Sequence, residues 1–202
     1  YSAAKHAGSG PGKSSTHGYS IGGAPWVGGE TIEKYSFASG TQDGALLSFN
    51  SSYQGAYRGG FSDGTYAYTA GRYTVLSGVE YNTNTIERFN TSTEAAIEDH
   101  GDLSLAISVG GYHSSQTDGY TAGGEGTPGG SAWFGHIDKF AFSSNVTAAG
   151  HGTLAPSRGV TGSYNTETTG YVSGGRTSNG GATNEIDKFS FTSNTTTTNC
   201  GT

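Results

Sequence analysis

Apolar and polar residues alternate along four short segments of the chain, and each segment carries aromatic residues on one of its two sides. In the clearest segment, IDKFSF, one side carries Ile186, Lys188 and Ser190 and the other carries Asp187, Phe189 and Phe191. Alternation with a period of two predicts a β-strand. Because large apolar side chains occur on both sides, we expect a sheet that packs between two neighbouring sheets.

The alternating segment is part of a repeat of about 50 residues. Its four copies are IEKYSF at 32–37, IERFN at 86–90, IDKFAF at 137–142 and IDKFSF at 186–191. Each copy is preceded by a tyrosine and glycine segment: GYSIGG at 18–23, AYTAGR at 67–72, GYTAGG at 119–124 and GYVSGG at 170–175. Each unit closes on a Gly-x-Leu sequence, at 44–46, 101–103 and 152–154, or on Gly201-Thr202. We therefore describe one repeat domain, 1–202, with units 1–46, 47–103, 104–154 and 155–202.

Each unit can hold four short strands separated by turn residues, which is the content of a propeller blade. The fold class predicted is all-β, a small β-propeller of four four-stranded blades. We expect the ring to close, because an open stack would leave an aromatic face of a terminal blade in water. The alternative is a segment of a larger propeller or fibre built from the same repeats.

The repeat resembles the kelch-type blade, with Tyr or Phe in place of the kelch Trp. More closely, GYTAGG followed by IDKFSF and a polar turn is similar to repeat proteins of marine bacteriophages, the cyanophages above all, which are virion structural or tail-fibre components. The second unit departs most, since Arg72 replaces a glycine and Asn90 follows its aromatic residue. The resemblance implies a kelch-like propeller, a location in the virion, and partners that include other virion proteins in a homo-oligomer or symmetric assembly.

Composition agrees with an all-β class. The 202 residues include 36 Gly, 13 Tyr and 9 Phe, and only 13% are charged, so aromatic rings must supply much of the core. The net charge of −6 and the absence of a basic cluster exclude nucleic acid as a partner. No apolar run approaches the roughly 20 residues of a membrane helix, so we expect no membrane insertion. The single cysteine, Cys200, rules out an internal disulfide and a cysteine-based zinc site.

We expect no catalytic, metal-binding or cofactor-binding residues and no cofactor. The six histidines lack the close spacing of metal ligands, and no nucleophile elbow is present. One acid–base pair recurs per unit: Glu33-Lys34, Glu87-Arg88, Asp138-Lys139 and Asp187-Lys188. Neighbouring strand residues point to opposite faces, so we interpret these pairs as structural. Asn-x-Ser/Thr sequences at Asn50, Asn90, Asn145 and Asn194 are interpreted as turns, with glycosylation as the alternative.

Aromatic residues between the repeated segments are the candidate contact residues. We expect them in loops, where the four units diverge and where rings make economical contacts with protein or sugar. They are Trp26, Tyr53, Tyr57, Tyr66, Tyr73, Tyr112, Trp133 and Tyr164.

The function predicted is therefore a non-enzymatic structural or interaction module of a phage virion, as a tail-fibre, tail-appendage or capsid-decorating protein. It would act through contacts with other proteins or with a host surface glycan. The alternative from another class is an extracellular carbohydrate-binding or glycan-active propeller, for which two unlike carboxylates in one pocket would be the sign.

Overall fold

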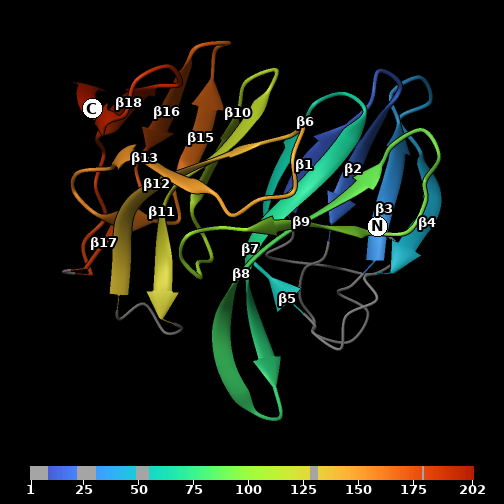
Figure 1. Cartoon of the computed structure of the whole chain (residues 1–202), viewed down its shortest axis with the longest axis horizontal. Helices are drawn as coiled ribbons and strands as arrows, with labels where there is room; N and C mark the ends of the chain where they lie inside the picture. The colour runs from blue at the N-terminus through green and yellow to red at the C-terminus, as the bar shows by residue number, and fades with distance from the viewer. Residues whose placement is uncertain (1–8, 22–30, 49–54, 128–131, 179) are drawn as a thin grey trace.

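Four antiparallel sheets follow one another along the chain, and each sheet is one blade of a β-propeller (Figure 1). The computed structural model describes residues 9–21, 31–48, 55–127, 132–178 and 180–202. Within these ranges every regular element is a strand. None of the described residues belongs to a helix that is long and apolar enough to cross a membrane.

Each blade has four strands in chain order from its first strand outward. The first blade contains β1 (Ser9–Lys13), β2 (His17–Ile21), β3 (Thr31–Ser36) and β4 (Gln42–Ser48). The second contains β6 (Gly59–Ser62), β7 (Tyr66–Leu76), β8 (Val79–Asn90) and β9 (Glu98–Asp102), and β5 (Gly55–Ala56) also pairs with β7.

The third and fourth blades repeat this order. The third contains β10 (Gly111–Ser114), β11 (Asp118–Thr127), β12 (Ala132–Ala141) and β13 (Ala149–Thr153). The fourth contains β15 (Gly162–Asn165), β16 (Thr169–Ser173), β18 (Ile186–Ser190) and β20 (Thr198–Gly201). The short strand β19 (Thr195–Thr196) pairs with β13 and so ties the fourth blade to the third. A further pair, β14 (Arg158–Gly159) with β17 (Arg176–Thr177), lies within the fourth unit.

In three of the four units a glycine precedes the repeated tyrosine and makes room for an aromatic ring of the next strand. A Cβ atom added to Gly170 would lie 2.5 Å from the ring of Phe189, and one added to Gly119 would lie 2.4 Å from the ring of Phe140. A side chain at either position would displace the ring, since real Cβ atoms do not approach other atoms so closely. The glycine therefore leaves the space that an aromatic ring of the next strand fills, and this determines how the rings of the blade pack.

Three apolar clusters form the core, and each lies between two consecutive blades. In every cluster the repeated tyrosine of one blade meets the aromatic strand of the next. The hydroxyl group of Tyr120 donates to the carbonyl of Phe191 at 3.2 Å, and the two rings stack at 4.2 Å. Tyr68 and Phe142 repeat this arrangement at 3.3 Å and 4.5 Å. The strand faces predicted from the alternation are thus the faces that pack.

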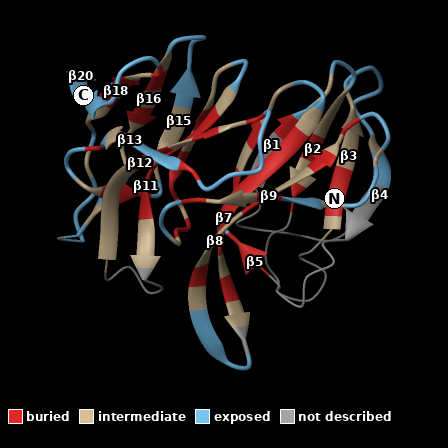
Figure 2. Ribbon diagram, in the orientation of Figure 1, coloured by how far each residue is buried: buried red, intermediate tan, exposed pale blue. Residues whose placement is uncertain are grey.

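The four-bladed propeller predicted from the sequence is confirmed, and the closure of its ring stays a prediction. In Figure 1 the first blade lies at the right and the fourth at the left. Lys13 of the first blade and Asn165 of the fourth blade line one hollow between them. In each described junction a blade packs on its successor, and buried residues occur in all four blades (Figure 2).

One repeat boundary also differs from its prediction. Gly152 and Gly201 pair with the first isoleucine of their alternating segments, but Gly44 pairs with Lys34, two residues further along. Leu47 takes the place opposite Ile32. The Gly-x-Leu match in the first unit is therefore displaced, because bulges shift the register of β4.

Candidate functional site

Four equivalent turns join the first strand of each blade to the second. We call them the turn rim: residues 14–16, 63–65, 115–117 and 166–168. The first residue of each turn accepts two backbone N–H groups through its side-chain oxygen, as Asp63 does from Thr65 at 2.8 Å and Tyr66 at 2.6 Å. Ser14, Ser115 and Thr166 make the same pair of bonds. Such side-chain caps hold a turn in one conformation.

The tip of each turn carries a different residue on this shared frame. Ser15, Gly64, Gln116 and Glu167 occupy the equivalent tip position, and all four are exposed. The frame is constant because its hydrogen bonds are backbone and capping bonds, and the tip is free to vary because it makes none of them. The turn rim is therefore a surface whose chemistry changes from blade to blade.

Two polar hollows lie against the turn rim. One, of about 720 Å³, is lined by Lys13 and by turns of the second, third and fourth blades, including Asp63, Gln116 and Glu167. The other, of about 670 Å³, lies between the third and fourth blades and shares Gln116 and Glu167. Hydroxyl, amide and carboxylate groups dominate both linings. Such groups can bind a hydroxyl-rich ligand or a polar protein surface.

The repeated acidic residues stabilise the blades. Asp187 pairs with the buried guanidinium of Arg158. Asp138 accepts hydrogen bonds from the backbone and hydroxyl of Ser104 at 2.8 Å and 2.7 Å. Glu87 pairs with two arginines, at 3.2 Å and 2.9 Å. Buried carboxylates need such partners, so these residues are engaged inside their blades.

The histidines of the blades also have structural contacts. His100 and His151 donate Nε2–H to carbonyls of the following blade, at 3.1 Å and 2.9 Å. His113 donates Nδ1–H to the carbonyl of Tyr164 at 3.0 Å, and its Nε2 atom has no hydrogen-bond partner. Burial lowers the pKa of His113 to about 4, since a second proton would be held on a buried nitrogen without an acceptor.

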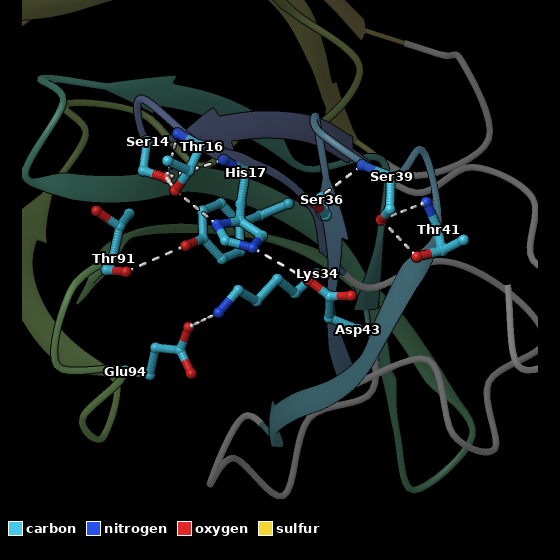
Figure 3. A network of polar contacts seen from close by, with 11 residues as sticks. Ser14, Thr16, His17, Lys34, Ser36, Ser39, Thr41, Asp43, Thr91 and Glu94 are labelled. Atoms are coloured by element: carbon cyan, nitrogen blue, oxygen red, sulfur yellow. Dashed lines mark hydrogen bonds and ion pairs between the residues drawn. The ribbon is translucent and has the colours of Figure 1, made fainter.

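A hydroxyl, an imidazole and a carboxylate line up beside the first turn (Figure 3). Thr16 Oγ1 lies 2.7 Å from His17 Nδ1, and His17 Nε2 lies 3.1 Å from Asp43 Oδ2. Neither of the two hollows at the turn rim includes these residues. The same capping hydroxyl that orders the other turns, here Ser14, lies beside them. This network fastens the first turn to β4.

The candidate contact aromatics do not form one surface. Trp26 and Tyr53 lie outside the described residues. Tyr57 and Tyr164 are exposed, but they belong to different blades. The expectation that these aromatics lie in loops is wrong for five residues, which the structure places on strands: Tyr66, Tyr73, Tyr112, Trp133 and Tyr164.

Tyr66, Tyr73 and Tyr112 pack against neighbouring side chains, whereas Tyr164 is exposed. The guanidinium of Arg88 lies 4.3 Å from the ring centre of Tyr66, and Tyr112 meets Phe61 edge to face at 5.7 Å. Burial, together with Glu80, raises the pKa of Tyr73 to about 12. These rings pack within the blades rather than in loops, because they alternate with polar residues at the spacing of a strand.

Sequence reasoning missed the turn rim, although a signal for it was present. The four turns follow one pattern, a capping residue, any residue, Thr, any residue, Gly or Ala, and Tyr: SSTHGY, DGTYAY, SQTDGY and TETTGY. The tyrosine and glycine segment begins only at the fifth residue of this pattern, so it leaves out the capping position four residues earlier. Extending the repeat toward the N-terminus would have found the capping positions.

Comparisons with known proteins support the fold. No protein-family model matches the chain, and no curated protein sequence matches it. The solved structure of YjhT is similar, with a TM-score of 0.82 and 13% sequence identity over 98% of this chain. The match covers 65% of the YjhT chain, so this chain spans less than two thirds of it. At this identity the likeness shows the fold alone.

Proposed function

We propose that this chain is a non-enzymatic interaction module of a phage virion, as a tail-fibre, tail-appendage or capsid-decorating protein, and that its turn rim contacts a partner protein or a host surface glycan. The proposed contact rests on one observation. The four turns share the same capping hydrogen bonds, and each exposes a different residue at its tip. Surfaces of this kind are positioned by a rigid scaffold and vary in specificity. The virion assignment is supported by the resemblance of the repeat to marine phage proteins.

The engagement of the repeated acids in blade packing favours binding over catalysis. A glycan-active site needs two carboxylates free to face one bond. Asp118, in the second hollow, instead lies 3.3 Å from Lys139 and 2.7 Å from the hydroxyl of Thr117. The alternative function is an extracellular carbohydrate-binding or glycan-active propeller, and the first hollow brings together two unlike carboxylates, Asp63 and Glu167. The hydroxyl and amide lining of the two hollows supports it.

Two measurements test the proposal. Mass spectrometry of purified phage particles whose genome encodes the chain should find it as a particle protein, and its absence from them would refute the virion role. Surface plasmon resonance on immobilised bacterial lipopolysaccharide tests the glycan arm. A double variant, Gln116→Ala with Glu167→Ala, should then bind at least tenfold more weakly. Val79→Ser, at an exposed apolar residue distant in sequence, is the control.

A further inference from the structure

The second of the two hollows at the turn rim, of about 670 Å³, lies between the third and fourth blades. We call it the interblade hollow. Turns and strands of both blades line it, and the lining residues belong to the described part of the chain. The hollow therefore belongs to an internal junction, with both of its walls in place.

Small side chains in the third blade leave space that larger ones fill in the second. In the second blade, Arg88 lies 4.3 Å from the ring centre of Tyr66, and its Nε–H donates to Glu98 at 3.1 Å. Strand register places Asp118 at the position of Tyr66. The same register places Ala149 at the position of Glu98. The third blade therefore lacks the ring and the carboxylate that occupy this region of the second.

Lys139 occupies the position of Arg88 and has a different partner. Its Nζ atom lies 3.3 Å from Oδ2 of Asp118. The hydroxyl of Thr117 donates to the same Oδ2 atom at 2.7 Å. Among the described residues both partners of Asp118 lie on Oδ2, so Oδ1 can accept a further hydrogen bond. An ammonium group carries three donors, so the pair offers an acceptor and a donor side by side.

Other residues add acceptors to the interblade hollow. His151 donates Nε2–H to the carbonyl of Ser190 at 2.9 Å, so Nδ1 of its neutral ring is an acceptor. Asn194 donates Nδ2–H to the carbonyl of Gly150 at 3.2 Å, which leaves its Oδ1 atom to accept. Glu167, at the exposed tip of the fourth turn, contributes a carboxylate. The lining is therefore rich in acceptors, and its charged side chains are one lysine and two acids.

We propose that the interblade hollow binds a neutral glycan, and that Asp118 and Lys139 hold two adjacent hydroxyl groups of one sugar. One hydroxyl donates to Asp118, and its neighbour accepts from Lys139. Two hydroxyls on neighbouring ring carbons supply this donor and this acceptor close together. The inference rests on the proposed function, because it names the class of glycan that the turn rim meets.

A neutral glycan suits this lining better than an acidic or an apolar ligand. Its hydroxyl groups supply the donors that the carboxylates, the imidazole and the amide can accept. An apolar ligand would leave these groups desolvated and unpaired, which costs binding free energy. A carboxylated or sulfated sugar would bring negative charge to a hollow in which acids already outnumber the lysine.

Surface plasmon resonance on immobilised polysaccharides tests the charge of the ligand. Dextran, mannan and galactomannan are neutral, and dextran sulfate is an acidic polymer on the same skeleton as dextran. The chain should bind at least one of the three neutral polymers, and at least tenfold more tightly than it binds dextran sulfate. Binding to none of the three, or a preference for dextran sulfate, would overturn the inference.

Periodate tests the adjacent hydroxyl groups, because it cleaves the carbon–carbon bond between them. The neutral polymer that binds is oxidised with periodate, and the aldehydes formed are reduced with borohydride. Binding should fall at least tenfold after this treatment. Undiminished binding would contradict recognition through an adjacent pair.

Three variants test the location of the binding site. Asp118→Asn keeps the size of the side chain and removes its charge, so binding should weaken at least tenfold. Ala149→Glu adds the acid of the second blade opposite Lys139, and by occupying that lysine it should weaken binding similarly. Lys188→Gln changes the equivalent lysine of the fourth blade, outside the hollow, and should bind like the unaltered chain.

Circular dichroism establishes that each variant folds. A folded Asp118→Asn chain with unchanged binding would sink the inference. The outcome is separable from that of the proposed function. If lipopolysaccharide binds through Gln116 and Glu167 while the neutral polymers do not bind, the inference fails and the proposed function stands. Absence of the chain from phage particles would refute the virion role without bearing on the hollow.

Discussion

Phe37 and Phe191 occupy the same position of the repeat, yet one is 58% exposed and the other 4%. Both follow the same alternating segment, and both lie over the glycine of their own blade. The difference is the neighbour: Tyr120 of the third blade stacks on Phe191, and no described blade precedes Phe37. The comparison teaches that the repeat decides which way a ring points, and that an adjacent blade decides whether it is buried.

The junction between the first and second blades lacks the stacked tyrosine–phenylalanine pair of the other two junctions, and an edge-to-face contact takes its place. Thr91 stands where the third and fourth blades have a phenylalanine, so Tyr19 meets Phe89 edge to face at 5.2 Å. The hydroxyl of Tyr19 still donates to the Thr91 carbonyl at 3.1 Å. An ion pair between Lys34 and Glu94 also crosses this junction (Figure 3). The tyrosine hydroxyl bond is thus the contact that all three junctions share.

The largest expected effect comes from truncating the two phenylalanines. Phe191→Ala should lower the free energy of unfolding by about 3 to 5 kcal/mol, because it leaves a cavity under Tyr120. Phe37→Ala should change the stability of the monomer by less than about 0.5 kcal/mol, because the ring is largely in water. Urea unfolding at low protein concentration measures both. Equal losses would contradict the difference in burial.

Lowering the pH should destabilise the junction between the third and fourth blades, because that junction buries His113. The pKa of buried His113 is about 4 in the folded chain and 6.5 in the unfolded one. The unfolded state therefore binds the proton more tightly. The stability that neutral His113 contributes is complete above pH 6.5 and is lost as the pH falls from about 6.5 to 4. The loss amounts to about 3 kcal/mol.

A variant taken from the second blade isolates this effect. Phe61 occupies the position equivalent to His113, so His113→Phe replaces the titrating ring by one that the repeat already uses. Urea midpoints measured between pH 4 and 7 should fall less steeply in this variant than in the unaltered chain. Parallel curves would show that His113 does not set the acid sensitivity.

The smallest expected effect is the difference in stability between removing the Tyr120 hydroxyl and removing the Tyr171 hydroxyl. Tyr120→Phe removes the bond to the Phe191 carbonyl and should cost about 1 kcal/mol. Tyr171→Phe should leave the unfolding of the monomer unchanged, because among the described residues the Tyr171 hydroxyl has no equivalent bond. Denaturation of the two variants under one set of conditions measures the difference. A loss of similar size in both would mean that Tyr171 has a contact within the chain.

Much of the fold could be predicted from the residues. The alternation in IDKFSF placed Phe189 and Phe191 on one side and Ile186 on the other, and the structure keeps these faces. The structural role expected for Asp187 agrees with its pairing to Arg158. The turn rim was not predicted, because its capping residues vary among Ser, Asp and Thr, and they share a hydrogen-bonding role rather than a residue type.

The sequence alone determined the number of blades, the strands that carry the aromatic rings and the side of each strand on which they lie. Backbone geometry alone sends alternate side chains to opposite faces, so these features need no knowledge of distant contacts. Only the tertiary structure decided which faces are covered and where the capped turns gather. Burial depends on the position of the neighbouring blade, and identical repeat sequences do not encode whether a neighbour is there.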